Sequence, residues 1–137
     1  MGAASAPDPL SHLPALAAWR AGRCLDLRVR LAASFGSRLR GLLGVPLPPD
    51  LALLIRPCAS VHMWGMRQPL DVLFLGREGT VLQTCTLRPW QLRGAARAHA
   101  VLECAAGTLA RLDLRAGQRL QFQAVAPPLP RTPELQP

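Results

Sequence analysis

Alternating apolar and polar side chains mark the first clear element of the chain, residues 24–31. Leucine or valine occupies every second position there, and cysteine, aspartate or arginine stands between them. Because successive side chains of a strand point to opposite faces, this alternation predicts a half-buried β-strand. Short apolar segments bounded by glycine, proline or polar residues predict five more strands, over residues 51–56, 70–75, 80–87, 99–104 and 119–125.

Helical spacing of apolar residues appears in two places. Residues 34–43 start at a serine suited to an N-cap and are followed by a glycine and a proline that stop a helix. Residues 106–114 predict a second short helix with two leucines turned inward. The glycines of residues 76–79 predict a hairpin turn, which makes the strands on either side antiparallel. The pattern therefore predicts an α+β domain with a mostly antiparallel sheet and two short helices.

The two ends of the chain differ in composition from its middle. Residues 1–22 are rich in alanine and proline, and residues 126–137 hold five prolines, so both are expected to be extended tails. A chain of 137 residues suits one compact single domain, which we place at residues 23–125. No apolar run approaches the roughly 18 residues of a membrane-spanning helix, so no membrane span is predicted.

The charge balance first suggests a polyanionic partner, because sixteen arginines against eight acidic residues give a formal charge of +8. Lysine, tyrosine and asparagine are absent, however, while amino acids with GC-rich codons abound. Much of the arginine excess therefore follows from base composition. The arginines are also dispersed, and three tryptophans and three phenylalanines offer few rings for stacking on bases. The sequence thus argues against a nucleic-acid partner.

The four cysteines have no CxxC spacing and are too few for a disulfide scaffold. The first residues lack the basic region and the apolar run of a secretory signal peptide. We therefore expect reduced thiols and a cytoplasmic location.

The segment from Cys58 to Asp71 concentrates the residues that could carry chemistry. Asp71 interrupts an apolar strand and is expected on the same face as Leu73. An unpaired buried charge is costly, so this carboxylate needs a role. It is expected either to act as an acid, a base or a ligand-binding group, or to anchor the loop through Arg67, Arg38 or backbone hydrogen bonds.

Cys58 and His62 stand four residues apart, a spacing that on a helix could hold a metal or form a catalytic pair. The residues between them give no helical pattern, so we expect a packed or hydrogen-bonded His62, no metal site and no cofactor. Glu103 is a second carboxylate beside an apolar run. If Asp71 and Glu103 faced one cleft, they would suit acid–base catalysis.

Two motifs in this order resemble a known family, the domain of unknown function 192, also called UPF0127. The first is H-M-W-G-M-R-Q-P-L-D-V-L-F-L and the second is A-V-L-E-C-A-A-G-T-L-A-R-L-D-L-R-A-G-Q-R-L, preceded by R-x-x-G-L in the first predicted helix. The resemblance covers about residues 26–122 and implies a small, barrel-like, largely antiparallel sheet. It implies no activity, because the family has none established. The matching motif positions are Arg38, Gly41, Met66, Pro69, Asp71, Glu103, Gly107 and Gly117.

Three functions follow from these observations. We expect a non-enzymatic accessory or binding domain whose pocket, around Cys58–Asp71, takes a small ligand or a protein partner. Its binding residues would be Arg38, His62, Trp64, Met66, Arg67 and Asp71. The first alternative is a small hydrolase-like or isomerase-like enzyme that uses Asp71 with His62 or Glu103. The second alternative is a basic surface module that binds nucleic acid or an assembly partner.

Overall fold

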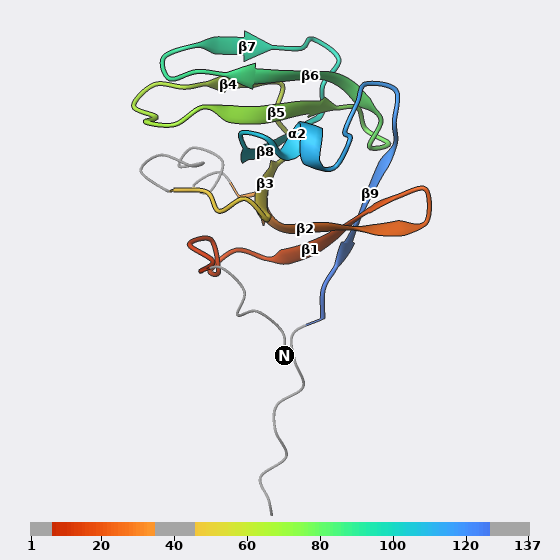
Figure 1. Ribbon diagram of the computed structural model, residues 1–137. Helices are drawn as coiled ribbons and strands as arrows, with labels where there is room; N and C mark the ends of the chain where they lie inside the picture. Colours follow the sequence, from red (N-terminus) through yellow and green to blue (C-terminus); the bar gives the residue numbers. More distant parts are fainter. Residues whose placement is uncertain (1–6, 35–45, 127–137) are drawn as a thin grey trace, which may run out of the picture.

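Strands dominate the computed structural model, which describes residues 7–34 and 46–126 (Figure 1). Seven of them form one sheet in the order β6-β5-β8-β3-β2-β1-β9, and a separate small sheet pairs β4 with β7. The strands are β1 (Ala15–Arg20), β2 (Arg23–Ala32), β3 (Leu51–Ile55), β4 (Ser60–His62), β5 (Leu70–Leu75), β6 (Val81–Leu87), β7 (Leu92–Gly94), β8 (Ala100–Ala105) and β9 (Leu120–Ala124). The six strands predicted from the apolar pattern are all present.

Antiparallel pairing prevails, as predicted. The exception in the large sheet is the pair of β2 and β3, which run parallel. The predicted hairpin joins β5 and β6, and its turn is closed by hydrogen bonds between Gly76 and Thr80 and between Gly79 and Gly76. β8 pairs with β3 on one side and β5 on the other. It therefore lies inside the sheet although it comes late in the sequence.

The sheet is not closed into a barrel, so the barrel-like shape expected from the family resemblance is wrong. The edge strands β6 and β9 approach each other only at their beginnings, through an isolated bridge between Thr80 and Arg119. Three backbone hydrogen bonds accompany this bridge: Leu120 N–H donates to the Gly79 carbonyl (2.9 Å), Val81 N–H donates to the Gln118 carbonyl (2.7 Å), and Gly117 N–H donates to the Val81 carbonyl (2.8 Å). No continuous ladder joins the two edges.

The described helix is α2 (Thr108–Arg111), a single turn inside the predicted segment 106–114. The other predicted helix, residues 34–43, lies almost wholly outside the described residues, as does Arg38. Two short helices are therefore not what the structure describes. No helix in the described ranges has the length and apolar character needed to cross a membrane.

The N-terminal tail predicted for residues 1–22 contains a strand. β1 pairs with both β2 and β9, and its Leu16 and Ala18 side chains are buried. The small alanine side chains of this segment conceal the alternation that would predict a strand. The tail predicted for residues 126–137 lies outside the described residues from position 127 onward.

Each face of the large sheet carries its own core. On β5, Leu70, Val72 and Phe74 join one cluster of buried residues, here called the first core. Leu73 and Leu75 join the other, the second core. This division is the one that the alternation along β5 predicts. The small sheet of β4 and β7 lies near β5 and β6, away from β1 and β9 (Figure 1), and its Val61 belongs to the first core.

Candidate functional site

Asp71 is buried and fully engaged by hydrogen bonds. Its Oδ1 accepts from the Thr86 hydroxyl at 2.7 Å, and its Oδ2 accepts from the backbone N–H groups of Gly107 (2.9 Å) and Leu109 (3.0 Å). These N–H groups lie at the start of α2 and have no partner within that helix. Asp71 therefore fixes α2 onto the beginning of β5. It forms no ion pair with Arg67, which is exposed.

Glu103 lies on the opposite face of the sheet from Asp71. Cross-strand partners share a face, and the register pairs Asp71 with Cys104 but Val72 with Glu103. Cys104 belongs to the second core and Val72 to the first. The structure therefore places the two carboxylates on opposite faces and not in one cleft, because adjacent positions of a strand point in opposite directions.

The Glu103 side chain is buried beside the first core, with 7% of its surface exposed. Burial raises the pKa of its carboxyl from an ordinary 4.5 to about 7, because the charged form loses its water. Across the described ranges, no group donates a hydrogen bond to this carboxyl. Glu103 is thus a buried carboxyl group in an apolar setting, where its neutral form is favoured.

Three aromatic rings form a row on the surface beside β4 and β7. The His62 and Trp64 rings are stacked, with centroids 6.0 Å apart and planes inclined by 20°. The Trp64 and Trp90 rings follow at 6.1 Å and 35°. Trp64 is 47% exposed and Trp90 is 66% exposed. We call these three residues the aromatic row; its exposed faces suit a ligand with flat, stacking groups.

The backbone around Met63 holds the aromatic row in place. Met63 is fully buried in the first core. Its carbonyl accepts from the Trp90 N–H (2.8 Å), and its N–H donates to the Gln91 carbonyl (2.8 Å). Trp90 itself has a φ of 71°, a left-handed conformation that costs a residue with a side chain ~1–2 kcal/mol. Packing and hydrogen bonds thus keep a large exposed ring in a strained position, as is common at functional surfaces.

The surroundings of the aromatic row are basic. Residues 56–70 and 79–102 together contain five arginines and no acidic residue. Arg67 and Arg93 are exposed, and Arg93 pairs with Val61, next to His62, in the small sheet. Neither arginine takes part in an ion pair with another described residue.

The predicted ligand-binding residues are therefore divided. His62, Trp64 and Arg67 are exposed, Met66 is partly buried against the first core, and Asp71 is buried under α2. His62 stacks on Trp64 and is not packed in the interior. Trp90 was missed because the segment before β7 reads as a loop and carries no periodic signal.

The four cysteines differ in their exposure, from the exposed Cys24 to the buried Cys104. The Cys58 thiol donates to the Ser60 carbonyl at 3.2 Å. Burial raises the pKa of the Cys104 thiol, with Asp71 and Glu103 adding to the effect. Burial also raises the pKa of the Cys85 thiol, although Arg93 acts in the opposite direction. Within residues 7–34 and 46–126, no three His, Cys, Asp or Glu side chains gather as a metal-binding set.

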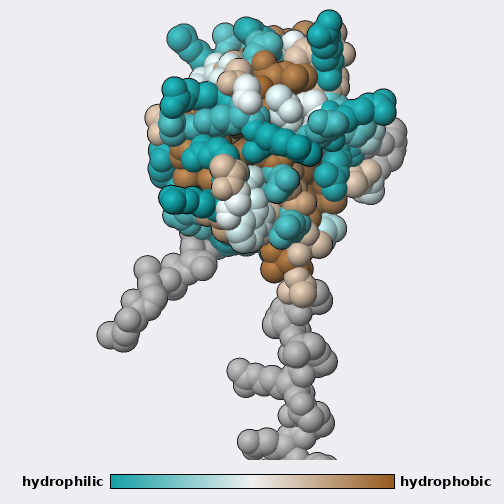
Figure 2. Space-filling model, turned by 90° about the vertical axis from the view of Figure 1, so that its right-hand side faces the viewer, coloured by the Kyte–Doolittle hydropathy of each residue, from teal (hydrophilic) through white to brown (hydrophobic). Residues whose placement is uncertain are grey.

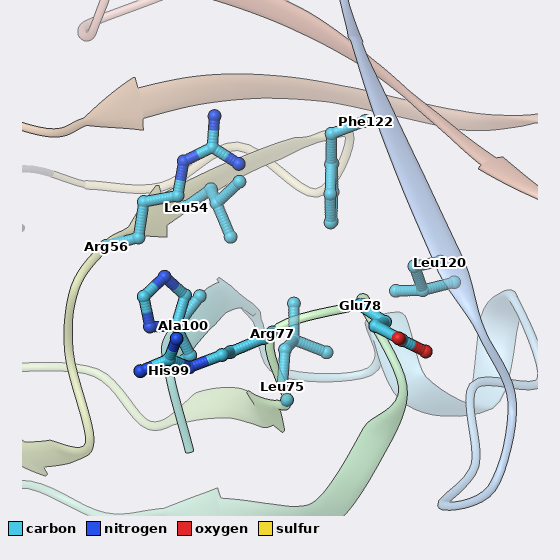
Figure 3. A pocket seen from close by; sticks show the side chains of 11 residues that line it. Leu54, Arg56, Leu75, Arg77, Glu78, His99, Ala100, Leu120 and Phe122 are labelled. Atoms are coloured by element: carbon cyan, nitrogen blue, oxygen red, sulfur yellow. The ribbon is translucent and has the colours of Figure 1, made fainter.

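Two cavities lie away from the predicted pocket. One, of about 150 Å³, is found where β3 and β5 end and β8 begins (Figure 3). The other, of about 800 Å³, runs between β1, β2 and β9 and shares Arg56 and Phe122 with the first. Of the predicted site residues that the structure describes, none lines either cavity.

These observations define the class of protein: a small β-rich domain with a structural carboxylate under its helix and an exposed aromatic row. The family model DUF192, described as "Uncharacterized ACR, COG1430", matches residues 17–122. The chain belongs to this family. The match includes part of β1, in agreement with the structure.

Relatives with known sequences or structures support this assignment. The chain is 30% identical to UPF0127 proteins of Thermococcus sibiricus, over 110 residues, and Pyrococcus furiosus, over 107 residues. Each alignment covers 74% of this chain, with 70% of the first relative and 91% of the second.

Two solved structures share the fold. A Sinorhizobium meliloti protein described as a "putative transcription regulator" is 30% identical, with a TM-score of 0.66 over 80% of this chain and 92% of its own. A protein of unknown function from Novosphingobium aromaticivorans is 25% identical, with a TM-score of 0.69 over 87% and 93%.

Proposed function

We propose that this protein is a non-enzymatic binding domain that holds single-stranded nucleic acid on its aromatic row. The observation that carries the proposal is the stack of His62, Trp64 and Trp90, in which two of the chain's three tryptophans are exposed side by side. Bases of any sequence stack on such rings, and arginines beside them contact the phosphates. The proposed location remains the cytoplasm.

The placement of charge supports this partner more than the number of arginines does. The sequence argued against nucleic acid because aromatic rings are few and arginines are dispersed. The fold, however, brings the few rings together beside Arg67 and Arg93, in segments without acidic residues. A phosphate backbone is attracted to such a surface and releases counterions on binding.

An enzyme that pairs Asp71 with His62 or Glu103 is less well supported. Asp71 already accepts three hydrogen bonds beneath α2. His62 is exposed and Glu103 lies on the other face of the sheet. A general acid or base must be within hydrogen-bond reach of its partner or of the substrate.

The proposal is tested by fluorescence anisotropy with a labelled twelve-nucleotide oligo(dT), titrated with the full chain at several salt concentrations. We expect binding that weakens as salt rises. Replacing one stacking ring should cost ~1–3 kcal/mol, so Trp90→Ala should weaken binding roughly tenfold or more. Val125→Ala, which alters another exposed apolar residue, is the matched control. Arg67→Gln should weaken binding more than Arg23→Gln.

Two results would overturn the proposal. One is the absence of saturable binding at low salt. The other is salt-dependent binding that Trp90→Ala and Trp64→Ala leave unchanged, because a diffuse electrostatic attraction would then explain the affinity without the aromatic row.

A further inference from the structure

The cavity of about 150 Å³ combines basic side chains with an apolar wall. Arg56 directly follows β3, Arg77 follows β5, and His99 precedes β8. β8 is antiparallel to both β3 and β5, so the last residues of β3 and β5 and the first residues of β8 lie together at one end of the strands. Figure 3 shows Arg56, Arg77 and His99 on one side of the cavity and Leu120 and Phe122 of β9 on the other.

The two arginines of the cavity have no charge partner in the described part of the chain. None of its salt bridges or side-chain hydrogen bonds involves the side chains of Arg56, Arg77 or His99. Arg56 is half-buried and Arg77 is exposed, so both guanidinium groups can be reached by an anion from solvent. A guanidinium presents parallel N–H donors that match the two oxygens of a carboxylate.

We propose that this cavity binds a small monocarboxylate, with the carboxylate on Arg56 and Arg77 and a short aliphatic body against Leu120 and Phe122. This site shares no residue with the aromatic row and does not depend on the function proposed above. A volume of about 150 Å³ exceeds the need of a single water several-fold. It suits a molecule of a few carbon atoms.

Glu78 makes the cavity favour a singly charged ligand over a multiply charged one. It lines the same cavity, and its carboxylate points away from the arginines in Figure 3. A negative charge at this rim repels a second negative charge on the ligand while leaving the arginine side available. Repulsion of this kind is a common source of specificity, and it disfavours phosphate relative to a monocarboxylate.

The test uses the full chain and sodium butyrate as the probe, with inorganic phosphate and chloride for comparison. Butyrate binding is followed by the shifts of backbone amide signals in a ¹⁵N correlation spectrum. We expect saturable shifts at Gly76, Gly79 and Ala100, which line the cavity. Phosphate should bind more weakly than butyrate, and chloride should not saturate.

Variants then test whether Arg56 and Arg77 bind the carboxylate of butyrate. Arg56→Gln and Arg77→Gln should each weaken butyrate binding at least tenfold, while Arg97→Gln, which removes the same charge outside the cavity, should have little effect. Thermal unfolding without ligand checks that each variant is folded. Butyrate shifts scattered over the surface, equal losses in all three variants, or tighter binding of phosphate would overturn the proposal. The wild-type shift map decides the matter even if a variant fails to fold.

Discussion

Replacing Glu103 with glutamine should change how the stability of this protein depends on pH. The side chain is buried against the first core without a hydrogen-bond donor among the described residues, so the folded state favours its protonated form. Glutamine has nearly the same shape and cannot ionise. Any difference between the two proteins that varies with pH therefore reports the carboxyl group itself.

The size of the effect follows from the raised pKa. The carboxyl titrates at about 7 in the folded chain and at 4.5 ordinarily. Between these values the folded protein binds more protons than the unfolded one, so stability falls as pH rises. Each pH unit in this window is worth ~1.4 kcal/mol, which gives a loss of about 3 kcal/mol from pH 4.5 to pH 7. Below pH 4.5 Glu103 is neutral in both states and costs the fold no stability through ionisation. Above about pH 7 it is ionised in both states, and the loss of stability no longer changes with pH.

Urea unfolding followed by tryptophan fluorescence at pH 4.5, 6 and 8 measures this difference. The free energies of unfolding of wild type and Glu103→Gln should be similar at pH 4.5, and the variant should be more stable at pH 8 by about 3 kcal/mol. Glu78→Gln, which alters an exposed carboxylate, should follow the wild-type curve. If Glu103→Gln runs parallel to wild type from pH 4.5 to 8, the carboxyl is not protonated in the fold and the reasoning is refuted.

Two further substitutions test contacts between distant segments: the hydrogen bonds of Asp71 to α2, and the close approach of Gly79 to β9. Asp71→Ala leaves two backbone N–H groups and one hydroxyl without their acceptor and should cost about 2–3 kcal/mol in urea unfolding. Asp26→Ala, at an exposed ion pair, should change little, and equal losses would contradict the role of Asp71. Gly79→Ala should destabilise more than Gly117→Ala, although both have positive φ, because its Cβ would overlap the Leu120 carbonyl oxygen. Equal melting temperatures of these two variants would show that the close approach of β9 can relax.

The strands that face two cores were predictable because their patterns are strong. β5 is apolar throughout except at Asp71, and the alternation placed this residue on the correct face. β1 was missed because alanine occupies three of its six positions and hides the alternation around the buried Leu16 and Ala18, and β7 because its three residues are all exposed. β7 is a strand because it pairs with β4. No pattern within its own three residues predicts this pairing.

The candidate site was predictable only in part, because its contacts cross long stretches of sequence. Asp71 was recognised as needing a partner, but the Gly107 N–H lies 36 residues further along. Asp71 and Glu103 lie on opposite faces because of the register of β5 and β8. A shift of one residue in this register would put the two side chains on the same face. The row of His62, Trp64 and Trp90 forms only after β4 and β7 pair.

The position of β8 inside the sheet governs when the protein can fold during its synthesis. Until residues 100–105 have left the ribosome, β3 and β5 each present an unpaired edge, because both await the same strand. The nascent chain then holds two incomplete pieces, β1 to β3 and β5 with β6, and neither covers its apolar faces. Exposed strand edges of this kind invite pairing with other chains. A chain cut short before β8 is therefore a substrate for chaperones or aggregation, and the last third of the sequence completes the core that the first two thirds require.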